Sequence, residues 1–336
     1  MLSRRFALTS ATAATFICAP WIRRAEAATI TYKFGSDLPA SHPLNLRMRE
    51  AATLIEQDTN GQMRIELFPD NQLGSDPDMF SQLRAGALEF FTVSGANALS
   101  SLVPGAAISA VGFAFSSTDQ AFAAMDGALG ASIRQQINKA GIIVLDKAWN
   151  NGFREITTRT RPIYLPSDLK GLKIRVPPGR QYVDLFKALG TAPTAMSFNE
   201  VYSALQTGTI DGQENPLAVI SLAKLYEVQR YCSLTRHIWD GFWFLCNQAA
   251  WRRLPGSVQE IVAKHVNAKA LEERQDVVQL NASLEKFLKK NGMKMISVDP
   301  ANFRDALRQT NYYANQKAFF GEEAWANLEA VSGKLA

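Results

Sequence analysis

Alternation between strand-like and helix-like segments is the feature that most constrains the fold of this chain. Polar and apolar residues alternate over residues 29–34 and 63–68, which predicts two strands. Between them, residues 44–58 carry apolar side chains at helical spacing on one side. Strands that alternate with helices in this way predict an α/β fold with a mostly parallel sheet and helices on both faces.

The same alternation continues to the end of the chain. We expect further strands at residues 89–94, 141–145, 156–160, 172–176, 242–245 and 294–298. We expect further helices at residues 76–87, 179–189, 198–206, 216–226, 257–290 and 300–328. The long helix at 257–290 ends at Asn291-Gly292, a usual helix stop.

The first 27 residues have the composition of an export signal. Arg4 and Arg5 precede an apolar run that is too short to span a bilayer, and Ala25-Glu26-Ala27 forms an A-x-A cleavage site. The paired arginines leave twin-arginine export and ordinary secretion both open. We therefore expect a periplasmic protein whose signal is cleaved near Ala27.

Removing this signal changes the charge of the protein. The whole chain carries a net +5, and the signal contributes +3 of it through Arg4, Arg5, Arg23, Arg24 and Glu26. The mature chain is thus only about +2, so its basic character gives no reason to expect a nucleic-acid partner. Roughly 309 residues remain, which is long for a single core and suits two lobes.

The cysteines leave two alternatives open. Cys18 departs with the signal, whereas Cys232 and Cys246 stay in the mature chain, both within apolar surroundings. In an exported protein they could form a disulfide. Two buried free thiols fit their apolar neighbours at least as well.

Catalytic and metal-binding motifs are missing from the sequence. It holds no G-x-S-x-G, P-loop, G-x-G-x-x-G or H-E-x-x-H pattern, and its three histidines lack metal-ligand spacing. We therefore expect no catalytic residue, no metal and no cofactor. A hydrolase or lyase that uses Glu200, Asp211 or Glu214 remains an alternative.

Two residues suited to bind a carboxylate each lie shortly before a proline. Arg175 lies among apolar residues just before Pro177, so its guanidinium is expected near the carboxyl end of a short strand. Asn215 precedes Pro216, which favours an extended or capping position. If the two meet in a cleft, a planar fork of donors and an amide can bind a carboxylate. Arg154 either has a ligand or cleft role or forms a surface or interlobe salt bridge.

Four long segments together resemble one known family. They are ELFPDNQLG at 66–74, NGFR at 151–154, PSDLKGLKIRVP at 166–177 and FNEVYSALQTGTIDGQENP at 198–216. These segments are similar to those of DctP-type solute-binding proteins, which serve tripartite ATP-independent periplasmic (TRAP) transporters. The resemblance extends over nearly the whole mature chain.

The resemblance implies a two-lobed fold with a ligand cleft between the lobes, crossed by hinge strands and a long helix. Residues 28–151 plus about 241–280 would form lobe I, and residues 152–240 plus about 281–336 lobe II. Arg175 matches the arginine that pairs with a substrate carboxylate, Arg154 a second arginine that often joins it, and Asn215 an asparagine at the same ligand. Positions at which such proteins vary to choose substrates are Asp37, Trp149, Trp239, Asp240 and Phe242.

The implied function is that of a monomeric receptor. It would capture a small organic acid through an arginine–carboxylate salt bridge and deliver it to the small and large membrane subunits of a TRAP permease. Residues 236–244 are rich in aromatic side chains, which favours a flat or aromatic acid over a small diacid such as succinate. A receptor that signals to a sensor kinase is the alternative with the same fold.

Overall fold

One ten-stranded sheet runs through the protein, whose computed structural model describes residues 29–335. The strands are β1 (Ile30–Gly35), β2 (Met63–Phe68), β3 (Phe90–Ser94), β4 (Ile142–Val144), β5 (Trp149–Thr158), β6 (Lys173–Val176), β7 (Ala192–Ala195), β8 (Gly212–Pro216), β9 (Tyr231–Asn247) and β10 (Lys294–Ser297). The predicted export signal lies outside the described residues.

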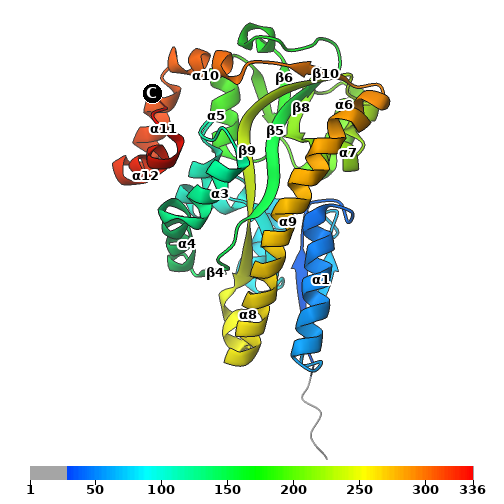
Figure 1. Ribbon diagram of the computed structural model, residues 1–336, viewed down its shortest axis with the longest axis vertical. Helices are drawn as coiled ribbons and strands as arrows, with labels where there is room; N and C mark the ends of the chain where they lie inside the picture. Colours follow the sequence, from blue (N-terminus) through cyan, green and yellow to red (C-terminus); the bar gives the residue numbers. More distant parts are fainter. Residues whose placement is uncertain (1–28, 336) are drawn as a thin grey trace, which may run out of the picture.

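Helices cover the sheet on its two faces and at its ends (Figure 1). They are α1 (Pro43–Asp58), α2 (Asp76–Ala85), α3 (Thr118–Asp126), α4 (Ala128–Lys139), α5 (Arg180–Ala188), α6 (Val201–Thr207), α7 (Leu217–Leu222), α8 (Gln248–Arg253), α9 (Gly256–Lys290), α10 (Pro300–Arg308), α11 (Tyr312–Phe320) and α12 (Glu322–Ser332). No described helix is long and apolar enough to cross a membrane.

The sheet consists of two parallel parts joined by long antiparallel strands. Its order is β2-β1-β3-β9-β5-β8-β6-β7, with β4 and β10 also paired to β9. Strands β1 to β3 pair in parallel, as do β6 to β8, whereas β9 pairs antiparallel with β3, β4 and β5. The α/β prediction is confirmed, but the sheet is mixed rather than mostly parallel, because β5 and β9 pass through both parts.

The length of β9 is the main difference from the predicted elements. The sequence pattern marked only residues 242–245, yet the strand covers Tyr231–Asn247. The part before the predicted strand, residues 231–241, holds Thr235, His237 and Asp240, and all three are buried. Buried polar residues break the apolar alternation by which a strand is recognised, so this part was not predicted. Figure 1 shows β5 and β9 running side by side along the long axis of the molecule.

The long helix α9 supports both parts of the sheet. It was predicted within one residue at its start and ends as expected at Asn291. Its apolar side chains occur at helical spacing and are buried against α1, β5 and α7; they include Val258, Val262, Val266, Ala270, Val277, Leu284 and Leu288. Figure 1 shows α9 crossing the molecule diagonally beside α1 and ending near α7.

The C-terminal region forms three helices instead of the single predicted one. Helix α11 ends at Gly321, whose φ of 83° is a conformation that glycine adopts without strain. Helix α11 contacts α5, and α12 contacts α3 and α4. The prediction of one helix over residues 300–328 is therefore wrong, although its helical character is confirmed.

The structure decides between the two alternatives for the cysteines. Cys232 and Cys246 are free and buried. They lie fourteen positions apart on the single extended strand β9, a separation of roughly 46 Å at about 3.3 Å per residue. A disulfide requires Cα atoms within about 7 Å of each other, so these two cannot pair.

Candidate functional site

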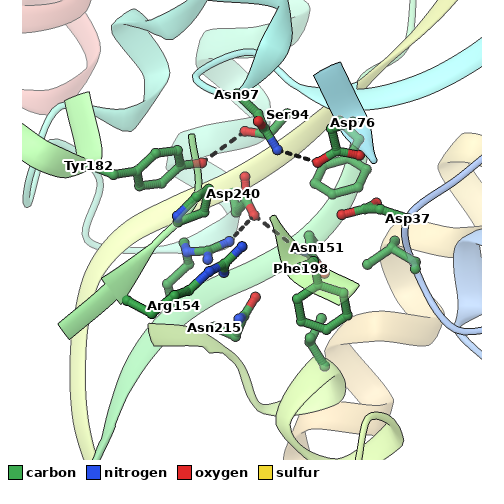
Figure 2. A pocket seen from close by; sticks show the side chains of 15 residues that line it. Asp37, Asp76, Ser94, Asn97, Asn151, Arg154, Tyr182, Phe198, Asn215 and Asp240 are labelled. Carbon is green, nitrogen blue, oxygen red and sulfur yellow. Dashed lines mark hydrogen bonds and ion pairs between the residues drawn. The ribbon is translucent and has the colours of Figure 1, made fainter. Parts of the chain in front are cut away.

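A pocket opens where the two parallel parts of the sheet meet (Figure 2). Six of the predicted site residues line it: Asp37, Arg154, Arg175, Asn215, Asp240 and Phe242. Asp37 follows β1, Arg175 and Asn215 stand near the carboxyl ends of β6 and β8, and Ser94 ends β3. Ligand sites in α/β sheets lie in the crevice outside the carboxyl ends of the strands, and this pocket occupies such a place.

Arg175 is buried without a carboxylate partner. Its side chain is only 2% exposed, and its Nε and Nη2 donate to the backbone oxygen of Met196 at 2.9 and 2.6 Å. The guanidinium carbon lies 5.9 Å from the centre of the Phe198 ring. No ion pair joins it to an acidic side chain within residues 29–335. Burial lowers the pKa of Arg175 to about 10, although the negative charge of Glu214 opposes this shift.

Arg154 is buried to the same degree but fully paired. Its Nε donates to Glu214 Oε2 at 2.5 Å and its Nη2 to Glu214 Oε1 at 2.8 Å, while its Nη1 donates to Asp240 Oδ2 at 2.5 Å. Burial alone would lower the pKa of Arg154, but the two carboxylates raise it above its usual value. Arg154 is thus held in place by the protein itself.

The backbone of β5 directs Arg154 into this position. Its pairing with β9 shifts register between Asn150 and Gly152 and again between Arg154 and Ile156. Gly152 has a φ of 104°, which glycine tolerates and other residues rarely adopt. Irregularities of this kind re-aim side chains beside binding sites, so these two shifts set the direction of the guanidinium.

The ion pairs of Arg154 continue into a buried network on β8 and β9. Glu214 Oε2 also contacts His237 Nε2 at 3.0 Å, and His237 Nδ1 lies 2.8 Å from Thr235 Oγ1. Burial raises the pKa of Glu214, but Arg154 and His237 outweigh it and hold that pKa below its usual value. Glu214 therefore serves as a counter-ion, a role that does not leave it free for the catalytic alternative.

Two acid–amide pairs lie on the walls of the pocket. Asn97 donates through Nδ2 to Asp76 Oδ2, and Asn151 donates through Nδ2 to Asp240 Oδ2 at 2.9 Å. Figure 2 shows Asp76 and Asn97 together, away from Arg154 and Asn215. Burial raises the pKa of Asp76 to about 7, against the opposing effect of its bond from Asn97.

Asn215 occupies an extended position on β8, as one of the two predicted possibilities. Its Nδ2 donates to Gln213 Oε1 at 2.6 Å, and it does not cap α7. Aromatic surface in the pocket comes from Phe198, Phe242 and Tyr182. The Tyr182 hydroxyl lies 3.1 Å from Ser94 Oγ.

Trp149 and Trp239 lie outside the lining of this pocket. Trp239 donates through Nε1 to Asn150 Oδ1 at 3.0 Å and packs edge-on against Phe115 and Phe122. Trp149 is fully buried in the hydrophobic cluster around α1 and α9. Both side chains contribute to the core in this conformation.

Several lining residues were missed from the sequence. They are Leu38, Asp76, Ser94, Asn97, Asn151, Pro177, Tyr182, Phe198 and Val219. Asn151 belongs to the NGFR segment and Phe198 opens another of the quoted segments, so both had a local signal. Asp76 and Asn97 had none, because a helix start and a loop asparagine have many structural explanations. Within residues 29–335, no group of three acidic, histidine or cysteine side chains could hold a metal.

Comparison with protein families identifies the chain. The model of the family described as bacterial extracellular solute-binding protein, family 7 (DctP), matches residues 34–319. The chain belongs to this family. The resemblance seen in the sequence is thereby confirmed, and so is the expectation of a receptor instead of an enzyme, since the DctP family consists of solute-binding proteins.

Individual members of the DctP family support the same conclusion. The 2,3-diketo-L-gulonate-binding periplasmic protein YiaO of Escherichia coli is 32% identical over 276 residues, 82% of this chain and 84% of that protein. An uncharacterized protein, y4mM of Sinorhizobium fredii, is 35% identical over 90% of this chain, which spans 56% of its length. A TRAP periplasmic solute-binding protein of Polaromonas sp. JS666, solved with D-erythronate, has 29% identity and a TM-score of 0.85, covering 91% of this chain and 99% of its own.

These comparisons also establish the two-lobed architecture. The Polaromonas structure and this chain superpose over most of their lengths. DctP-family proteins of this kind are periplasmic receptors of TRAP transporters, which confirms the transport class predicted from the sequence. The boundaries predicted for the two lobes remain a prediction.

Proposed function

We propose that this DctP-family protein captures a carboxylate-bearing small molecule through an ion pair with Arg175 and delivers it to TRAP membrane subunits. The observation that carries the proposal is a buried guanidinium that lines the pocket and has no acidic partner among residues 29–335. Buried charges are stable when paired, so an anion from outside complements this one. The relatives named for 2,3-diketo-L-gulonate and D-erythronate are consistent with an acid.

The geometry of Arg175 favours a carboxylate over other anions. Met196 holds one edge of the guanidinium by two hydrogen bonds, and no bond from Nη1 is present among the described residues. A planar fork held in this way can donate two parallel bonds to a carboxylate. Each such charged bond contributes about 1.5–3 kcal/mol net. Asn215, at the next strand, is the proposed second contact.

Binding is proposed to close the two lobes around the ligand. Asp37 follows β1 and Asp76 begins α2, so both adjoin the part of the sheet built by β1 to β3, whereas Arg175 and Asn215 lie on β6 and β8 of the other part. A ligand that contacts both parts at once does so only when they are close together. It therefore stabilises the closed state, which is a population shift.

An aromatic ligand has less support from the pocket lining than from the sequence pattern. Two of the aromatic residues behind that prediction, Trp239 and Trp243, belong to the core clusters and do not line the pocket. Phe242 and Phe198 remain as apolar walls. The pocket surface is mainly polar, so we do not retain aromaticity as part of the proposal.

Titration calorimetry with Arg175→Ala tests the proposal. We expect its affinity for the acid ligand to fall by about 2–5 kcal/mol, the range for removing one partner of a buried charge pair. Arg180→Ala is the matched control, because Arg180 is exposed, pairs only with Asp184 and does not line this pocket. An unchanged dissociation constant in Arg175→Ala would show that the carboxylate binds elsewhere.

Two further expectations complete the proposal. The exported protein should begin near Ala28, which N-terminal sequencing of the periplasmic form can show. It should also sediment as a monomer, with and without ligand. A start at residue 1, or a stable dimer, would correct these points without affecting the ligand site.

A further inference from the structure

Five acceptor oxygens in the pocket lining are buried and have no hydrogen-bond donor among the described residues. They are the Oδ1 atoms of Asp37, Asp76, Asn97, Asn151 and Asp240. Buried polar atoms nearly always have a partner in folded proteins. A ligand that fills this pocket and displaces water must therefore supply donors to these oxygens.

The two acid–amide pairs fix the direction of the amides. In each pair the amide Nδ2 donates to one carboxylate oxygen, Asn97 to Asp76 and Asn151 to Asp240. The amide nitrogen is the only donor of these side chains, so it turns toward the carboxylate and leaves the amide oxygen free. Each pair thus offers one carboxylate oxygen and one amide oxygen as acceptors.

The charge state of the acids does not remove this demand for donors. Burial raises the pKa of Asp76 to about 7 and that of Asp37 well above its usual value. A carboxyl group keeps acceptor capacity whether or not it is protonated, and amide oxygens are acceptors at every pH. A hydroxyl group both donates and accepts, so it matches either state of these acids.

We infer that the ligand is a polyhydroxylated monocarboxylic acid that donates its hydroxyl hydrogens to the unpartnered oxygens of the two acid–amide pairs and of Asp37. The inference rests on the proposed function, because it takes Arg175 as the partner of the carboxylate. In Figure 2, Asp76 and Asn97 lie on the side of the pocket away from Arg154 and Asn215. Asp240, which accepts a bond from Arg154, lies between these two sides, so the acceptor oxygens extend along the pocket.

Other acids fit these acceptors poorly. A second carboxylate offers only acceptors and cannot bond the amide oxygens of Asn97 and Asn151, while an alkyl chain covers the five oxygens without bonding them. Sites built to bond a substrate hydroxyl reject the analogue that lacks it, by up to about 10⁴-fold. Dicarboxylates and simple fatty acids should therefore bind weakly despite their carboxylates.

A series of four-carbon acids on the mature protein tests this inference by calorimetry. The probes are erythronate, 3,4-dihydroxybutyrate, butyrate and succinate, with gluconate, hexanoate and adipate as a six-carbon series to allow for chain length. In at least one series we expect the most hydroxylated acid to bind at least about 100-fold tighter than the alkyl acid and the diacid. Each hydroxyl removed should weaken binding in turn.

Substitution of Asp37 tests whether it bonds the ligand's hydroxyl groups, because a purely structural role would not change the affinity for the hydroxylated acid alone. Its carboxylate receives no side-chain bond from a described residue, so Asp37→Leu removes an acceptor without breaking a pair. We expect the hydroxylated acid to bind at least about tenfold more weakly and the alkyl acid to bind as before. Asp37→Asn keeps an amide oxygen and should lose less. Thermal unfolding checks that both variants fold.

The outcomes separate this inference from the proposed function. If butyrate or succinate binds as tightly as the hydroxylated acids, and Arg175→Ala abolishes binding of all of them, the inference is wrong and the proposed function stands. If binding of these acids does not depend on Arg175, the proposed function is wrong. If 4-aminobutyrate binds tightest, the donors come from an ammonium group and the hydroxyl inference is overturned. Binding by none of the acids would overturn both.

Discussion

Arg154 and Arg175 are two buried arginines in one pocket with opposite surroundings. Arg154 has two carboxylate partners, Glu214 and Asp240, at hydrogen-bond distance. Arg175 has a backbone oxygen and an aromatic ring. The surroundings raise the pKa of Arg154, whereas burial lowers that of Arg175 to about 10. The first arginine holds the protein together, and the second is available to an incoming anion.

The acids beside these arginines differ in the same way. Burial raises the pKa of Glu214, but its pairing with Arg154 and His237 brings that pKa below its usual value. Among residues 29–335, Asp76 receives a side-chain bond only from the amide of Asn97, and burial raises its pKa to about 7. The pocket thus has one part, around Arg154, whose charged groups form ion pairs within the protein. In the other part, around Arg175, the described residues form no such pairs. The proposal that Arg175, and not Arg154, pairs with the ligand therefore rests on the local charge balance more than on residue type.

Removal of the paired arginine should have the largest effect. Arg154→Met leaves Glu214 and Asp240 buried without their cation, so we expect the free energy of unfolding to fall by about 3–5 kcal/mol. Chemical denaturation measures it. Adding Glu214→Gln to the same chain removes one orphaned charge and should recover part of the loss. A loss below about 1 kcal/mol in Arg154→Met would show that the ion pairs contribute little.

Replacing Asp76 should change the pH dependence of stability. The folded chain keeps the Asp76 proton up to about pH 7, while the unfolded chain releases it near the ordinary value of 3.8. The unfolded state therefore binds fewer protons between these values, and stability falls as pH rises from about 4 to 7. Asp76→Asn has no carboxyl proton to lose. Its free energy of unfolding should therefore rise by about 2–4 kcal/mol relative to that of the wild type across this pH range.

Denaturation of the ligand-free protein at a series of pH values checks this expectation. Glu214 should change stability with pH in the opposite direction. Its pKa is depressed in the folded chain, so its contribution to stability is lost only as pH falls through the folded-state pKa. Parallel stability curves for the wild type and Asp76→Asn would contradict the separation into paired and unpaired acids.

Arg175→Lys should produce a moderate loss of binding. Lysine keeps the positive charge but lacks the planar fork that can donate two parallel bonds. We expect the affinity for the acid to fall about tenfold, close to 1.4 kcal/mol, as measured by calorimetry. A loss as large as that of Arg175→Ala would mean that shape, and not charge, dominates the contact.

Arg175→Met should have the smallest effect on stability. It removes two bonds to Met196 but also a buried charge without a counter-ion, and these terms oppose each other. We expect the ligand-free protein to unfold within about 1 kcal/mol of the wild type. Comparison with Arg154→Met under the same conditions provides the contrast. Equal destabilisation by both variants would remove the distinction between the two arginines.

Much of the fold followed from local patterns. Strands β1, β2 and β6 and helices α1 and α9 were predicted nearly to their ends, because each has a clear period and a proline or glycine boundary. Helices α3 and α4 were not predicted at all. Strand β9 was mostly hidden, because its buried polar residues serve the site and interrupt the pattern.

The site was predicted only in part. Arg175 and Asn215 were found because each precedes a proline in a strand-like setting, and Asp37, Asp240 and Phe242 came from the family resemblance. Asp76 and Asn97 were missed, since nothing local distinguishes them. Only folding brings the two together and places both in the pocket lining with Arg175.

The sequence by itself determined the class of this protein, because long ordered segments and helical or strand periods survive without any knowledge of contacts. The tertiary structure decided which charges are satisfied. Two arginines that look alike along the chain differ because β8 and β9 bring Glu214 and Asp240 to Arg154, whereas no carboxylate of the described residues forms an ion pair with Arg175. Electrostatic pairing depends on distance in space, and separation along the chain does not reveal it.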